Sequence, residues 1–116
     1  MAAPQFELDH LIAIVDNNRM QSDGVSKNIM NLGNIAQKWA AFGWNVQEVD
    51  GHDIEQLYDA FQAVGENKKP TVIIANTIKG KGISFMENNN EWHHNRLNNE
   101  QYEQACAELG ESIDGD

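Results

Sequence analysis

The feature that most constrains this fold is an alternation of three short segments that are predicted to be buried strands with two amphipathic helical patterns. The predicted strands cover Leu11–Val15, Asn45–Asp50 and Thr71–Asn76. The first and third are nearly continuous in Ile, Val, Leu and Ala, which is typical of parallel strands covered on both faces. Because strands that alternate with helices favour a parallel sheet with right-handed crossovers, we predict an α/β fold. Its core is a partial parallel sheet of three β-strands with crossover helices, in the order β-α-β-α-β-α.

Three helical patterns carry recognisable end signals. The first ends at Gly43, a residue suited to a helix C-terminus. The second begins at Asp53, with Gln56 three residues later as its capping partner. The third begins at about Asn99 and ends at Gly110. The side chains expected to face inward from these helices are Leu32, Ile35, Ala36, Trp39, Phe42, Ile54, Leu57, Tyr58, Phe61, Val64, Tyr102, Ala105, Cys106 and Leu109.

Polar residues follow each predicted strand. Because parallel strands end at the same edge of a sheet, residues 16–18, 50–53 and 77–82 are expected along one rim. The first segment offers side-chain oxygens suited to Mg²⁺ or Ca²⁺. Lys79 and Lys81 of the third lie in a loop with glycines at 80 and 82, where the backbone could approach a phosphate. Each segment is also explained as an ordinary turn or helix cap, so the residues alone leave both interpretations open.

Length and composition exclude several classes of protein. The 116 residues suffice for one small domain, which we place at residues 1–110 with an acidic tail at 111–116. A formal net charge of −10 argues against a nucleic-acid partner, because phosphate backbones would be repelled. Residues 1–10 lack the pattern of a signal peptide, and no segment has the apolar length needed to cross a membrane. The single cysteine, Cys106, excludes an internal disulfide and fits a reducing compartment, so we expect a cytoplasmic protein.

Taken together, these segments resemble the transketolase family. Residues 11–24 (Leu-Ile-Ala-Ile-Val-Asp-Asn-Asn-Arg-Met-Gln-Ser-Asp-Gly) are similar to the second half of its thiamine diphosphate motif. Further matches lie at residues 41–44, 49–53, 69–71, 77–82 and 86–93, and their order and spacing hold from Leu11 to Leu109. The chain resembles the amino-terminal subunit of split bacterial transketolases. In those enzymes the pyrophosphate-binding and pyrimidine-binding domains are separate polypeptides.

The resemblance implies a role for five residues. Asn18 matches the side-chain ligand of Mg²⁺ (or Ca²⁺), and Met20 matches the residue whose backbone carbonyl also coordinates the metal. Ile78 matches an apolar residue packed on the thiamine diphosphate. Lys79 and His93 match groups close to the diphosphate and the reacting centre. A lysine there neutralises phosphate charge, and His93, the candidate catalytic residue, could donate a hydrogen bond or move a proton.

The activity implied by the resemblance is the transfer of a two-carbon ketol unit from a ketose phosphate to an aldose phosphate. That reaction belongs to carbohydrate metabolism and the pentose phosphate pathway. The implied partners are sugar phosphates and a carboxy-terminal, pyrimidine-domain subunit, in a homo- or hetero-oligomer without nucleic acid or membrane.

The sequence departs from the family pattern at two places. The family motif opens with Gly-Asp-Gly well before its asparagine, whereas only 17 residues precede Asn18 and none of them is Gly. His94 stands where the family usually has Gly. We therefore expect a truncated subunit that supplies part of the diphosphate and metal site and is not active alone.

Two alternatives stay open at this stage. A deoxyxylulose-phosphate-synthase-like relative would share the cofactor motif, although Trp92-His93 and residues 85–88 favour transketolase. A non-catalytic fragment would instead dock on a complete transketolase.

Overall fold

A computed structural model of the chain describes residues 1–21, 24–25, 28, 30–65 and 67–110. The described residues form two compact units. The first unit comprises residues 1–18 and 30–77, and the second comprises the described parts of 19–29 and 78–110. The acidic tail predicted at 111–116 lies outside the described residues. Within those residues, no helix has both the length and the apolar character needed to cross a membrane.

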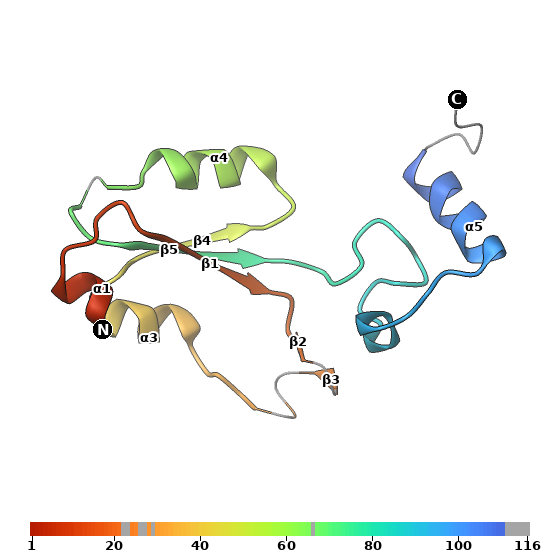
Figure 1. Ribbon diagram of the computed structural model, residues 1–116, viewed down its shortest axis with the longest axis horizontal. Coiled ribbons are helices and arrows are strands. Elements are labelled where there is room, and N and C mark those ends of the chain that lie inside the picture. The colour runs from red at the N-terminus through yellow and green to blue at the C-terminus, as the bar shows by residue number, and fades with distance from the viewer. Residues whose placement is uncertain (22–23, 26–27, 29, 66, 111–116) are drawn as a thin grey trace. The chain divides into compact units, whose positions relative to one another are not determined.

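The first unit is built on a parallel sheet of β1 (Ile12–Asn17), β4 (Asn45–Asp50) and β5 (Thr71–Asn76), in the order β1-β5-β4 (Figure 1). The predicted α/β class and the three-stranded parallel sheet are confirmed, and β4 and β5 have the predicted bounds. The first strand starts one residue later than predicted and continues to Asn17. The strand continues because its pairing with β5 extends as far as Asn17, which is in register with Asn76. Asp16 and Asn17, which were predicted to follow the strand, therefore lie within it.

Strand β5 is the core of this unit. Thr71, Val72 and Ile73 have no exposed surface, and the burial continues to Ala75. Strand β1 differs, because its side chains alternate between exposed and half-buried positions, and Ile14 is 59% exposed. The prediction that both faces of the first strand are covered is therefore wrong for this structure. In the described residues β1 pairs only with β5, and its even-numbered side chains lie on the uncovered face.

Two helices lie on opposite sides of the sheet, α3 (Ile35–Ala41) and α4 (Ile54–Gln62) (Figure 1). Helix α4 begins as predicted, because the Asp53 carboxylate accepts hydrogen bonds from the amides of Glu55 and Gln56, at 3.0 and 3.1 Å. Helix α3 ends as predicted just before Gly43, whose φ of 91° places it in the left-handed region. A further short helix, α1 (Ala2–Gln5), opens the chain.

The predicted inward faces of the helices are only partly buried. In α4 the buried residue is Ala60, whose carbonyl accepts a 3.1 Å hydrogen bond from the Gln47 side chain of β4. In the same helix Ile54 and Tyr58 are 77% and 62% exposed, contrary to prediction. The other predicted inward residues that are exposed are Leu32, Phe42, Phe61, Tyr102 and Leu109. In the first unit, the three-stranded sheet buries little of the apolar stripe of α4.

The second unit contains the strand pair β2 (Met20–Gln21) and β3 (Gly24–Val25), the 3-10 helix η1 (Asn90–His93) and helix α5 (Asn99–Leu109). Helix α5 has strong signals at both ends. Asn98 and Gln101 form a reciprocal capping box, and Gly110 ends the helix in the left-handed conformation. Ala105 and Cys106 are buried, so the cysteine is a packed thiol.

Candidate functional site

Side chains link all three strands at the carboxyl end of the sheet. The Asn17 amide donates to the Asn76 side-chain oxygen at 2.7 Å, and the Asn76 amide donates to Glu48 Oε1 at 3.1 Å. The link forms because Asn76 lies on the central strand, between the other two. Sequence reasoning missed Glu48 and Asn76, although each is a polar residue at or near the end of a predicted strand, and this signal could have singled them out.

The segment after β4 packs tightly against the end of β5. The Gly51 amide donates to the Asn76 carbonyl at 2.8 Å, and a Cβ added to Gly51 would lie 2.5 Å from Thr77 Cγ2. Thr77 in turn donates through its hydroxyl to the Asp16 carboxylate. The Asp50 carboxylate accepts from the His52 amide at 2.9 Å, and His52 is exposed. Residues 50–53 thus form a turn and a helix cap, which is one of the two interpretations that the sequence left open.

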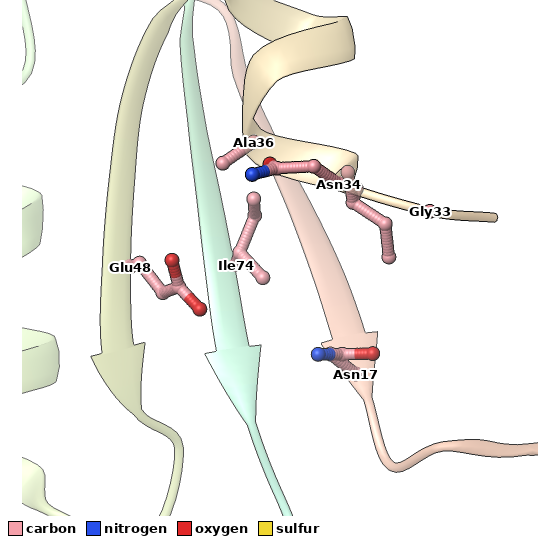
Figure 2. Close-up of a pocket in the computed structure, with 7 residues that line it drawn as sticks. Asn17, Gly33, Asn34, Ala36, Glu48 and Ile74 are labelled. Carbon is pink, nitrogen blue, oxygen red and sulfur yellow. The ribbon is translucent and has the colours of Figure 1, made fainter.

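A pocket of about 200 Å³ opens on the α3 side of this sheet (Figure 2). It is lined by Asn17, Glu48 and Ile74 from the strands and by residues 33–36 at the start of α3. None of the five residues predicted for the cofactor site lines it. Its polar groups are amides and one carboxylate, so it has no cation to attract a phosphate.

Two of the predicted site residues flank a sharp change of chain direction. Asn18 directly follows β1 and is half-buried, and Met20 opens β2, where it pairs with Val25. Arg19 between them has φ of 61°, a left-handed conformation that is uncommon for a residue with a side chain. Asn18 belongs to the first unit, and Met20 to the second.

Two further predicted cofactor contacts, Ile78 and Lys79, begin a closed loop in the second unit. This segment, residues 78–89, is called the Lys79 loop below. The Lys79 carbonyl accepts from the Asn88 amide at 2.9 Å, which closes the loop at its neck. Gly80 has φ of 73°, and a Cβ there would lie 2.5 Å from the Met86 carbonyl oxygen. Ile78 and Lys79 are both half-buried.

His93 lies at the end of η1, and the neighbouring Trp92 contacts the Lys79 loop. The Trp92 indole donates to the Phe85 carbonyl at 3.0 Å, and the two rings lie 5.3 Å apart. His93 itself is exposed, and its ring meets that of His94 edge-on at 4.9 Å. The second unit therefore brings the segments of Lys79 and His93 into contact through Phe85 and Trp92.

The oxygen donors predicted for the metal are of one chemical kind. Asn18 offers an amide oxygen and Met20 a main-chain carbonyl, both hard ligands suited to Mg²⁺ or Ca²⁺. Across the described part of the chain, no group of three or more His, Cys, Asp or Glu side chains could hold a metal ion. The two predicted donors are thus of the kind that a hard cation binds in proteins.

Comparison with known proteins identifies the domain to which this architecture corresponds. Residues 1–114 match the family described as "Transketolase, thiamine diphosphate binding domain". The chain is similar to an apulose-4-phosphate transketolase subunit of Phocaeicola vulgatus, with 43% identity over 98% of this chain and 41% of the relative. It is also similar to a 6-deoxy-6-sulfo-D-fructose transketolase subunit of a Clostridium species, with 47% identity over 88% of this chain and 38% of that relative.

Solved structures give the same result. The transketolase of Campylobacter jejuni superposes with a TM-score of 0.89 at 27% identity, over 97% of this chain and 18% of that one. The transketolase of Leishmania mexicana gives 0.87 at 27% identity, over 98% of this chain and 17% of that one. The chain thus spans about two-fifths of the length of the curated subunits it matches, and less than a fifth of these solved chains.

Proposed function

The chain belongs to the transketolase family, through its thiamine diphosphate binding domain, and we propose that it supplies the diphosphate- and metal-facing part of a ketol-transferring site. The observation that carries the proposal is the continuous match over residues 1–114. That match includes both the turn with Asn18 and Met20 and the segments with Lys79 and His93. The reaction is the transfer of a two-carbon ketol unit between a ketose phosphate and an aldose phosphate.

The roles proposed for the residues are those that the resemblance implies, and the chemistry of each side chain is compatible with its role. The amide oxygen of Asn18 and the carbonyl of Met20 would hold Mg²⁺, which binds few protein groups together with phosphate oxygens. The Lys79 ammonium would offset the charge of the diphosphate, and Ile78 would pack against the cofactor. His93 would donate a hydrogen bond to, or exchange a proton with, a substrate oxygen. When bound, thiamine diphosphate would supply a nucleophilic carbon for addition to the ketose and a ring that accepts the electron pair released when the carbon–carbon bond breaks.

Partners and substrates are proposed from the relatives. Two relatives are named as subunits of transketolases, which supports a multi-subunit arrangement. We place a carboxy-terminal, pyrimidine-domain subunit opposite this chain, in a cytoplasmic homo- or hetero-oligomer. The same two relatives are named for apulose 4-phosphate and for 6-deoxy-6-sulfo-D-fructose, both anionic sugars. A sugar phosphate, such as those of the pentose phosphate pathway, is therefore the substrate class we propose.

The direct test is a calorimetric titration of the chain with thiamine diphosphate and Mg²⁺. We expect measurable binding, which Lys79→Ala weakens about tenfold or more, because a charge-assisted contact is lost. Lys81→Ala is the matched control, since Lys81 lies two residues away in the same loop and is exposed. Absence of binding at millimolar cofactor, or equal losses in both variants, would overturn the proposal. The chain alone should give no ketol transfer from ribose 5-phosphate and a ketose phosphate donor.

A second candidate function rests on the uncovered face of β1. Ile14 is 59% exposed there and Ile12 is 36% exposed, on a strand paired on one side in the described residues. Such a surface suits a non-catalytic module that docks on a complete transketolase. Co-purification with a complete transketolase, without thiamine diphosphate binding by this chain, would favour that alternative.

The deoxyxylulose-phosphate-synthase-like alternative needs a different assay. Activity of this chain and its partner subunit with glyceraldehyde 3-phosphate and pyruvate would distinguish it from ketol transfer.

A further inference from the structure

A side chain of α5 holds the tip of the Lys79 loop. Glu108 accepts from the Ser84 amide through Oε2 and from the Ser84 hydroxyl through Oε1, both at 2.6 Å. Gln104, one turn earlier on the helix, donates to Glu108 Oε1 at 2.8 Å and to Ser84 Oγ at 3.3 Å. Both donors of Ser84 and both oxygens of Glu108 are therefore engaged in one contact.

The helix that provides this contact is a firm support. The Asn98 capping box stabilises its first turn, and Gly110 ends its last turn in the left-handed conformation. Ala105 and Cys106 of the same helix are buried. The hydrogen bond from the Ser84 hydroxyl is the largest of the causes that hold the pKa of Glu108 below its usual value. The carboxylate is therefore charged at neutral pH, and charged acceptors form the stronger hydrogen bonds.

The contact at Ser84 is connected to Lys79 through the backbone of the loop. The amide of Ile83, next to Ser84, donates to the Gly80 carbonyl at 3.2 Å, and the Asn88 amide closes the loop on the Lys79 carbonyl. A displaced Ser84 would thus carry Gly80 with it, and Gly80 adjoins Lys79. The Glu108 contact is consequently an external support of the segment that holds Lys79, beside the contact of Trp92 with Phe85.

We propose that Glu108 is a positioning residue: through Ser84 it holds the Lys79 loop in the conformation that presents Lys79 to an anionic ligand. This inference rests on the proposed function for the nature of that ligand, the diphosphate of the cofactor. It assigns α5 a role in the site although the helix provides none of the five predicted contacts.

Hydrogen exchange of the full chain, without cofactor, tests the contact itself. Glu108→Gln replaces one of the two carboxylate oxygens with an NH₂ group, so the side chain can no longer accept from the amide and the hydroxyl of Ser84 through separate oxygens. We expect amides of the Lys79 loop to exchange roughly three- to tenfold faster in this variant. Glu103→Gln is the matched control, because Glu103 is an exposed acid on the same helix and the change removes the same charge. Equal exchange in the two variants would overturn the proposal.

The pH dependence separates positioning from a general loss of stability. Below the folded pKa of Glu108 the native carboxyl is protonated, so the exchange of the native chain and of Glu108→Gln should converge there. Glu87, whose carboxylate accepts from the Gly82 amide in the same loop, is present in both proteins, so it does not alter the comparison. A difference that persists at low pH would mean that the variant only destabilises the fold.

Calorimetry with thiamine diphosphate and Mg²⁺ completes the test. Glu108→Gln should weaken binding about threefold or more relative to Glu103→Gln, because the ligand must order the loop. Faster exchange with unchanged affinity would overturn the positioning role. If the native chain binds no cofactor, the proposed function fails, while the exchange measurements still decide whether Glu108 holds the loop.

Discussion

Gly80 provides the sharpest test of the loop geometry. Its φ of 73° is disfavoured for a residue with a side chain, at a cost of about 1–2 kcal/mol. A Cβ would also lie 2.5 Å from the Met86 carbonyl oxygen and 2.6 Å from its carbonyl carbon, so main-chain atoms would have to move. Overpacking of this kind adds about 1–3 kcal/mol. Gly80→Ala should therefore reduce the free energy of unfolding by roughly 2–5 kcal/mol.

The chain contains a matched control for this substitution. Gly110 has nearly the same φ, 74°, but among the described residues beyond its immediate chain neighbours no atom lies within 4 Å of the position that a Cβ would occupy there. Gly110→Ala should therefore cost only the conformational part, about 1–2 kcal/mol. Urea unfolding followed by circular dichroism gives both values, and hydrogen exchange locates the loss in the Lys79 loop for Gly80→Ala. Equal costs for the two substitutions would refute the close approach of Gly80 to Met86.

Three further results are expected. Asn76→Ala removes the central member of the side-chain link between the strands and should lower the free energy of unfolding by about 1–3 kcal/mol in urea titrations, whereas an unchanged value would mean that the link adds nothing. Ile73→Ala, at a fully buried position, should lower the free energy of unfolding by about 2–5 kcal/mol. Ile14→Ala, at a 59% exposed position, should lower it much less, and similar losses in the two variants would contradict the observed burial. The lowered pKa of Glu108 means that its stabilisation is present above the ordinary carboxyl pKa and is lost as pH falls through the folded value. The free energy of unfolding should therefore fall more steeply with decreasing pH in the native chain than in Glu108→Gln, which keeps only the contribution of groups such as Asp53; equal slopes would contradict the contribution of Glu108.

The parts of the fold that local sequence determines could be predicted. Strands β4 and β5 have the predicted bounds, because Pro70 and the polar turn after Asp50 mark their limits independently of the rest of the chain. The helix starts and ends at Asp53, Gly43 and Gly110 were likewise predicted, since each depends on the chemistry of a cap.

The parts that depend on pairing could not be predicted. The extension of β1 to Asn17 follows from its register with β5, which no local pattern reveals. The link from Glu48 through Asn76 to Asn17 requires knowledge that β5 is central. The support of Ser84 by Glu108 joins residues 24 positions apart, so only the folded second unit reveals it. The exposure of Ile14 has the same origin, because it depends on how much of the sheet is covered.

The position of β5 between the other two strands also sets the order in which this sheet can form. In the described residues, neither β1 nor β4 is hydrogen-bonded to the other, and each pairs only with the strand that comes last in the sequence. On a ribosome, a nascent chain that has not yet exposed residue 76 holds two strands with no partner in this sheet. Folding of the first unit should consequently wait until β5 emerges, because both neighbouring strands pair with it.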